Sequence, residues 1–201
     1  MTAADTRSGI EPAGLLDLLA SRRVTRQFGP GAVAEGPLWM VLEAGRWASS
    51  ASNNRVHRLL VVRDPQRLKL VATMSPGIFS LPATMVVICT DLHAVAAAQL
   101  RLEQDRSVFI DVGTMLMNMM IEAHVLGLGT CPVTSFSQAG VGVVLELPPH
   151  ARPEAILQIG HPAGGASPAQ APRGGPSRLL TKLVYWERYG QAPPPAPIPS
   201  D

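Results

Sequence analysis

Apolar residues recur along much of the chain at spacings of three and four, the period of a helix that packs on a core. The longest such pattern predicts a buried helix from Ser107 to about Leu126, and Gly127 and Gly129 mark its end. A leucine cluster at Leu15–Leu19 predicts an earlier helix, and Pro37 suits the start of another. These patterns predict at least three helices.

Four other runs are apolar without a helical period, which is typical of short buried strands. They are Arg58–Val62, Met85–Thr90, Thr130–Phe136, which runs on into a loop, and Ala155–Gly160. The charged segment Asp91–Arg106 predicts a further helix. Because strands and helices do not alternate regularly, we expect an α+β fold.

The C-terminal part of the chain changes composition. Residues 162–176 are rich in Pro, Gly and Ala, which predicts an extended linker, whereas Lys182–Gly190 (KLVYWERYG) is aromatic and apolar. A long linker followed by an apolar patch is unusual within one compact unit. We therefore expect a single domain over residues 1–190, with 162–190 as an arm that reaches a second subunit, and a disordered Pro-rich tail over 191–201.

Composition narrows the class of protein. Hydrophobic residues make up 46% of the 201 residues, which excludes a disordered chain, and only 16% are charged, which favours a surface covered by a partner subunit. A net charge of +2 excludes nucleic-acid binding through a broad basic field. No signal peptide and no apolar run of about 18 residues is evident, so we expect no membrane contact. Cys89 and Cys131 lie in apolar segments, which predicts buried reduced thiols and a cytoplasmic protein.

The segment Ser21–Phe28 (SRRVTRQF) carries the candidate chemistry. It holds Arg22, Arg23 and Arg26, and on a helix end Arg22 and Arg26 would share a face. A guanidinium pairs with phosphate through two parallel hydrogen bonds, and a helix terminus adds backbone donors. The segment therefore indicates a site for a phosphorylated small molecule, with a solvated basic turn as the alternative.

Other catalytic signatures are absent from the sequence. There is no GxGxxG or GxxxxGK[ST] motif, no nucleophile elbow, and no metal-ligand spacing among the five His and two Cys, so we predict no metal site and no catalytic side chain. His124, on the predicted buried helix, is expected to be a satisfied core histidine. A phosphate site without an acid–base set favours a bound cofactor that carries the chemistry.

Four segments, in order, resemble the FMN-dependent nitroreductase superfamily. They are Arg22–Phe28 (family RRSxRxF), Ser49–Val62 (SSASNNRVHRLLVV; family PSxxNxQPWxFxVV), Asp111–Phe136 (the central helix, GLG turn and flavin-contacting strand) and Leu183–Gly190 (the tail). The resemblance implies a nitroreductase-like α+β fold, with a small mixed or antiparallel sheet flanked by helices. It also implies an intertwined homodimer with two interfacial FMN sites. The implied activity is ping-pong hydride transfer through flavin N5, from NADH or NADPH to nitroaromatic or quinone-type acceptors.

The resemblance also implies roles for residues near the N-terminus. Arg22, Arg23 and Val24 match the residues that hold the FMN phosphate and ribityl chain. Arg26 matches the cation near flavin N1 and O2, where positive charge stabilises the anionic reduced ring.

Further matches lie along the rest of the chain. Ser50 and Asn53 match polar contacts to the ring donated from the other subunit. The strand end against the flavin corresponds to Pro132, Val133, Thr134 and Ser135, with a backbone N–H of Thr134 or Ser135 directed at N5. Arg178, or alternatively Arg173, matches the late basic residue that returns to the phosphate.

The chain departs from the family pattern at several positions. Val24 replaces Ser, Ser49 replaces Pro, Arg55 replaces Gln and His57 replaces Trp, and the insertion that usually builds the substrate and nicotinamide pocket is reduced to Asp91–Arg106. Two alternatives therefore stay open. One is a dehydrogenase or oxidase that desaturates a peptide-derived metabolite, similar to the cyclic dipeptide oxidases, which work with a small partner protein. The other is a non-catalytic flavin-binding protein.

Overall fold

The computed structural model describes residues 11–102, 106–164, 188 and 191, and the chain forms two units, Met1–Ala169 and Gln170–Asp201. Every helix and strand of the described residues belongs to the first unit. Most of the expected arm, and all of the expected C-terminal tail except Gln191, lie outside the described residues.

The centre of the first unit is a four-stranded sheet in the order β1-β2-β4-β3. Its strands are β1 His57–Val62, β2 Thr84–Asp91, β3 Gly129–Val133 and β4 Ala151–Gly160. All neighbouring strands pair antiparallel, so the sheet is antiparallel rather than mixed. The four strands expected from the sequence are confirmed, and β1 and β3 are the two edges.

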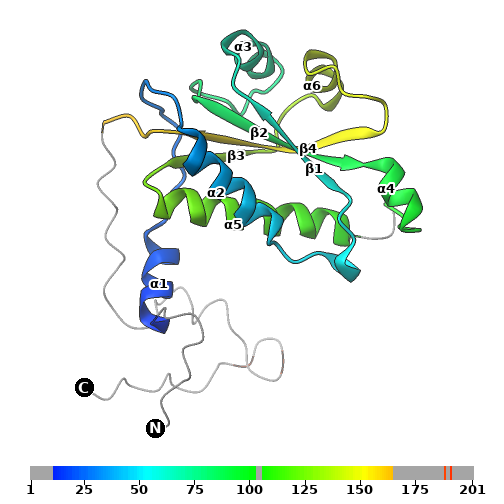
Figure 1. Ribbon diagram of the computed structural model, residues 1–201, viewed down its shortest axis with the longest axis horizontal. Coiled ribbons are helices and arrows are strands. Elements are labelled where there is room, and N and C mark those ends of the chain that lie inside the picture. Colours follow the sequence, from blue (N-terminus) through cyan, green and yellow to red (C-terminus); the bar gives the residue numbers. More distant parts are fainter. Residues whose placement is uncertain (1–10, 103–105, 165–187, 189–190, 192–201) are drawn as a thin grey trace. The chain divides into compact units, whose positions relative to one another are not determined.

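Helices cover both faces of the sheet (Figure 1). One face carries α2 Glu35–Arg46 and α5 Ser107–Val125, and the other carries α3 Pro65–Thr73 and α6 Gln138–Val144. Strand β2 contributes to both layers, because its alternate side chains point to opposite faces of the sheet. Val86 and Ile88 pack in the core with α2 and α5, whereas Met85 and Val87 pack in the core with α3 and α6. A sheet buried on both faces explains the continuous apolar strand sequences.

The long central helix is confirmed, but its environment differs from the expectation. By length and composition α5 would be able to cross a membrane. Its buried residues are Val108, Asp111, Val112, Met119, Met120 and Ala123, and it packs against α2 and the sheet, so we assign it as a core helix. Phe109 and Ile110 are nevertheless 50% and 63% exposed, so the helix is not buried all round within one chain.

The segment between β2 and α5 was predicted as one helix, and this prediction was wrong. Of the described residues in this segment, only α4 Leu92–Ala97 is helical, and it starts at the Asp91 side chain, which accepts hydrogen bonds from the first turn. Gln99 then takes a positive φ of 55° that ends it. Two further helices, α3 and α6, were not predicted from the sequence, because both are short and bury few residues. Cys89 and Cys131 are buried and unpaired, as predicted.

Candidate functional site

The basic segment is fixed against edge strand β3. After α1 Pro12–Ser21 the chain becomes extended, and Val24 forms a parallel bridge with Thr130. The Thr25 N–H donates to the Thr130 carbonyl at 2.8 Å. Gly129 permits this approach, because a Cβ built there would lie 2.6 Å from Thr25 Oγ1. The arginines are thereby attached to the same strand as the predicted flavin-contacting residues.

The helix argument for the arginines was wrong. α1 ends at Ser21, so Arg22 and Arg26 do not share a helix face, and the nearby terminus is a C-terminus that presents carbonyls rather than N–H donors. Any phosphate held here would depend on the guanidinium groups themselves.

The arginine side chains still fit an anion. Arg22 is half-buried, and its Nη1 is buried with no hydrogen-bond partner in the part of the chain that the structure describes. Such an unmet donor is costly, so it fits a site whose ligand supplies the acceptor. Arg23 and Arg26 are exposed, and Arg23 Nη1 donates to the Arg22 carbonyl at 2.9 Å. This donor set suits the phosphate of FMN.

His124 borders the arginines and is satisfied, although it is half-buried rather than in the core. Its Nε2 lies 3.0 Å from Ser21 Oγ. Desolvation lowers the pKa of His124, and the charges of Arg22 and Arg23 lower it further. His124 is therefore neutral near pH 7 and leaves the positive charge of this region to the arginines.

The far end of β3 carries the second group of predicted residues. Pro132 is half-buried, Val133 is buried, and Thr134 and Ser135 are exposed where the chain leaves the sheet. At about 3.3 Å per residue, the end of β3 at Val133 lies roughly 10 Å along the strand from Thr130. One edge of the sheet thus carries both the cationic segment and the polar residues expected against the flavin ring.

Ser50 and Asn53 lie in a separate loop that precedes β1. The loop contains the 3-10 turn η1 Ala51–Asn53, in which Ser52 and Asn53 have φ of 51° and 54°. The carboxylate of Asp111, which is 6% exposed, accepts from the Ala51 N–H, and Thr114 Oγ1 donates to the Ser49 carbonyl at 3.2 Å. Two side chains of α5 thus hold this loop in an unusual backbone conformation.

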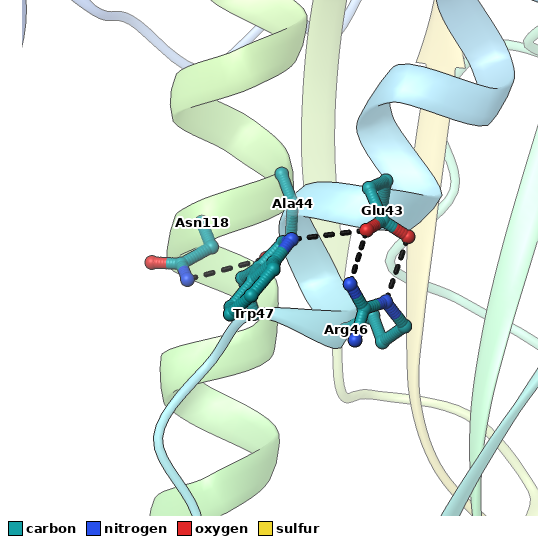
Figure 2. Close-up of polar contacts among 5 residues, drawn as sticks. All are labelled: Glu43, Ala44, Arg46, Trp47 and Asn118. Carbon is teal, nitrogen blue, oxygen red and sulfur yellow. Dashed lines mark hydrogen bonds and ion pairs between the residues drawn. The ribbon is translucent and has the colours of Figure 1, made fainter.

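The helix that leads into this loop is anchored at its C-terminal end (Figure 2). Glu43 accepts from Arg46 Nε at 2.8 Å and from Trp47 Nε1 at 2.9 Å, and the Arg46 guanidinium lies 4.5 Å from the Trp47 ring centroid. Asn118 of α5 donates to the Ala44 carbonyl at 3.2 Å. These contacts fix where the loop leaves α2.

A cavity of about 140 Å³ lies beside the loop. Its lining includes Ser50, Arg55, His57, Leu59, Asp111 and Met115. Burial lowers the pKa of His57, and the nearby carboxylates of Asp111 and Glu154 oppose the shift. His57 stands where the family pattern has the larger Trp, so the smaller side chain leaves space here.

One chain does not bring the two groups of residues together. The basic segment and Pro132–Ser135 lie at the β3 edge, whereas the Ser50 loop precedes β1 at the other edge, about 14 Å across three strand spacings. On α5, Thr114 contacts the Ser50 loop and His124 contacts Ser21, beside the basic segment. These two positions are about 15 Å apart along the helix. Arg173 and Arg178 lie outside the described residues.

The structure also brings together residues that no sequence pattern connects. Asp111 was not identified as a support of the Ser50 loop, since only the packing of α5 places it there. The absence of a metal site stays a prediction, but Asp91, His93 and His150 offer ligand atoms within 4.8 Å of one another. Their sequence spacing gives no signal, because strand pairing brings His150 to the other two.

Comparisons with known proteins agree with this geometry. Residues 74–161 match the nitroreductase family. The chain is 27% identical over 199 residues to an NADH dehydrogenase of Thermus thermophilus, covering 82% of this chain and 92% of the relative. It is 28% identical over 161 residues to an FMN reductase [NAD(P)H] of Bacillus subtilis, covering 72% of this chain and 64% of that protein.

Solved structures give the same fold. A nitroreductase family protein of Clostridium difficile superposes with a TM-score of 0.72 at 23% identity, covering 86% of this chain and 98% of that one. A putative NADH dehydrogenase/NAD(P)H nitroreductase from Parabacteroides distasonis gives 0.71 at 18% identity, covering 87% and 98%. At these identities the structural likeness supports the fold, and activity must be argued from the site.

Proposed function

We propose that the chain is a flavin-dependent oxidoreductase of the nitroreductase superfamily, and that it oxidises NADH or NADPH and reduces a nitroaromatic or quinone-type acceptor in a ping-pong cycle. The observation that carries the proposal is the buried Arg22 Nη1, which has no acceptor among the described residues, on a segment bridged to β3. FMN, when bound, supplies the site that takes up and releases the hydride.

The chain's own residues would bind and orient the cofactor. Arg22 and Arg23 would hold the phosphate, and the Val24 bridge would keep them in register with the flavin end of β3. Arg26 would place positive charge beside the pyrimidine side of the ring, which favours its reduced anionic form. The backbone N–H of Thr134 or Ser135 would mark the hydride-accepting edge. No side chain is assigned a proton-transfer step.

The Ser50 loop would complete the site from a second copy of the chain. Within one chain it lies too far from the arginines to meet the same ring. The surface supports such a partner, because large apolar side chains are exposed on α2 and α5, which cover one face of the sheet, and on α1, which contacts α5. They are Leu15, Leu16 and Leu19 of α1, Trp39 and Met40 of α2, Trp47 just after α2, and Phe109, Ile110, Met117 and Val125 of α5. Apolar groups of this extent mark protein interfaces, so we propose a homodimer.

The short segment between β2 and α5 favours one alternative activity. This segment is short, and α4 is the one helix among its described residues, so it offers little protein to build a nicotinamide pocket. A dehydrogenase or oxidase acting on a small peptide-derived metabolite, with or without a small partner protein, is therefore the second candidate.

Flavin reduction under anaerobic conditions separates these activities. We expect the purified protein to be yellow, to release FMN on denaturation, and to be bleached by NADH or NADPH. Bleaching only by an amino-acid-derived substrate would support the second candidate. A flavoprotein reduced by neither would favour a binding protein without catalysis.

The shared site has its own test, because a site built from two chains can be complemented. Arg22→Ala and Asn53→Ala homodimers should each bind FMN weakly. A heterodimer of the two has one site with both defects and one with neither, so half of the normal tight binding should return. No recovery in the purified heterodimer would place Arg22 and Asn53 in separate sites.

A further inference from the structure

We propose that Asp91, His93 and His150 bind a divalent transition-metal ion such as Zn²⁺, at a site that uses none of the residues assigned to the flavin. Their ligand atoms all lie within 4.8 Å of one another. In a tetrahedral zinc site, with bonds of about 2.0–2.1 Å, ligand atoms are roughly 3.3 Å apart. The three ligand atoms therefore need to move only slightly closer together to share one ion.

The backbone holds the three residues at fixed positions. Asp91 is the last residue of β2 and pairs with Ala151 of β4, directly after His150. The Leu92 N–H donates to the His150 carbonyl at 2.7 Å, which ties the start of α4 to this turn. Sites built at the ends of paired strands are more precise than sites on free loops.

The Asp91 carboxylate is already oriented as a metal ligand would be. Its Oδ1 accepts from the N–H groups of His93 at 3.0 Å and Ala94 at 3.2 Å. The Ala94 hydrogen bond is the largest cause that lowers the pKa of Asp91, followed by the charge of Arg58, so the group is anionic. Hydrogen bonds of this kind orient carboxylate ligands and tune their affinity for metals.

The two imidazoles supply the nitrogen ligands. Their rings stack with centroids 4.2 Å apart and planes 14° from parallel. Stacked rings direct their nitrogens alongside one another rather than at one point, so one ring must turn. His93 is exposed, and the terminal torsion of a histidine is broad, so its ring is free to make that turn.

Arg58 is the competitor for this site. Its Nη2 contacts Asp91 Oδ2 at 2.8 Å, but the Arg58 side chain is 56% exposed, and exposed ion pairs are weak. Arg58 Nη1 also donates to the carbonyls of Arg55 at 2.9 Å and His57 at 3.0 Å. A metal ion is therefore able to displace Nη2 without leaving the guanidinium unpartnered.

The ligand set selects the class of ion. Imidazole suits zinc, copper and nickel, whereas magnesium and calcium prefer oxygen alone. Three protein ligands leave at least one position for water. The site would thus clamp the β2–α4 turn to the start of β4.

The experiment is calorimetric titration of the full-length, untagged holoprotein with ZnCl₂ after removal of metals by a chelator. We expect one Zn²⁺ per chain with a micromolar dissociation constant, and no heat with MgCl₂. His93→Ala and His150→Ala should each weaken binding at least tenfold, whereas His161→Ala, which removes an exposed histidine outside the cluster, should not. Arg58→Gln should tighten binding several-fold, because it removes the competitor.

Tighter binding on Arg58→Gln separates a metal site from general damage, since loss of structure would only weaken binding. Because His93 is exposed, its replacement leaves the fold intact, and melting in EDTA verifies this. Absence of Zn²⁺ binding at 100 µM, or equal binding by wild type and His93→Ala, would overturn the proposal.

Discussion

The carboxylate of Asp111 accepts a hydrogen bond from the Ala51 N–H, with 3.2 Å to Oδ1 and 3.3 Å to Oδ2. This bond joins the buried side of α5 to the loop that carries Ser50 and Asn53. It makes a core helix the support of residues proposed to reach the partner's flavin.

Replacing Asp111 should loosen that loop. Asp111→Ala leaves the Ala51 N–H without its acceptor, and we expect a loss of about 1–3 kcal/mol in stability together with weaker FMN binding. Asp111→Asn keeps an acceptor oxygen and should restore most of both. Urea unfolding and fluorescence titration with FMN measure the two effects, and equal damage by both variants would contradict a role based on this hydrogen bond.

Arg22→Ala should weaken FMN binding by about 1.5–3 kcal/mol, the range for hydrogen bonds to charged groups. The fold should persist, since Arg22 contributes little to the core. Arg67→Ala is the matched control, because Arg67 pairs with Glu146 at 3.1 Å, in the layer of α3 and α6. An unchanged dissociation constant for Arg22→Ala would assign the phosphate to other residues.

Gly129→Ala should displace the basic segment from β3. The new Cβ would lie 2.7 Å from Thr25 Cβ, which is close to the backbone and moves little. Overpacking of this kind costs about 1–3 kcal/mol, and here it should also weaken FMN binding. Thr25→Gly in the same chain should relieve the contact. If the double variant binds FMN no better than Gly129→Ala alone, the clash is not the cause.

An added charge on α5 should break the proposed dimer. Ile110→Lys places an ammonium within the exposed apolar face, and we expect monomers by light scattering together with loss of FMN. Val143→Lys is the control, because Val143 is 79% exposed on α6, on the opposite face of the sheet. If the dimer persists with Ile110→Lys but is lost with Val143→Lys, the interface lies on the other face of the sheet.

Stability should fall as the pH drops below about 6.5, in part through His57. Burial lowers its folded pKa from the ordinary value of 6.5, so in this window the unfolded state binds a proton that the folded state does not. Uptake of this proton lowers the free energy of unfolding by at most about 1.4 kcal/mol per pH unit. Well above pH 6.5 both states are neutral at His57, so the loss of stability is absent there. His57→Gln should reduce the fall in the free energy of unfolding, measured with urea, between pH 7 and pH 5.5. An unchanged slope would show that other groups carry the acid sensitivity.

Some local features of this chain followed from its sequence. The four strands and the central helix are long enough, and apolar enough, for periodicity to identify them. The run of arginines and the lack of catalytic motifs likewise indicated a site where a cofactor carries the chemistry. The charged segment after Asp91 forms a shorter helix than predicted, because its sequence indicates where the helix begins but not that it ends at Gln99.

What the sequence did not contain are the relationships made by pairing and packing. The bridge from Val24 to Thr130, the support of Ala51 by Asp111, and the meeting of His150 with Asp91 each join residues at least 59 positions apart. The separation of the arginines from the Ser50 loop was also decided only in the tertiary structure. Sequence records which side chains are available, whereas the strand order β1-β2-β4-β3 sets which edge of the sheet each one reaches.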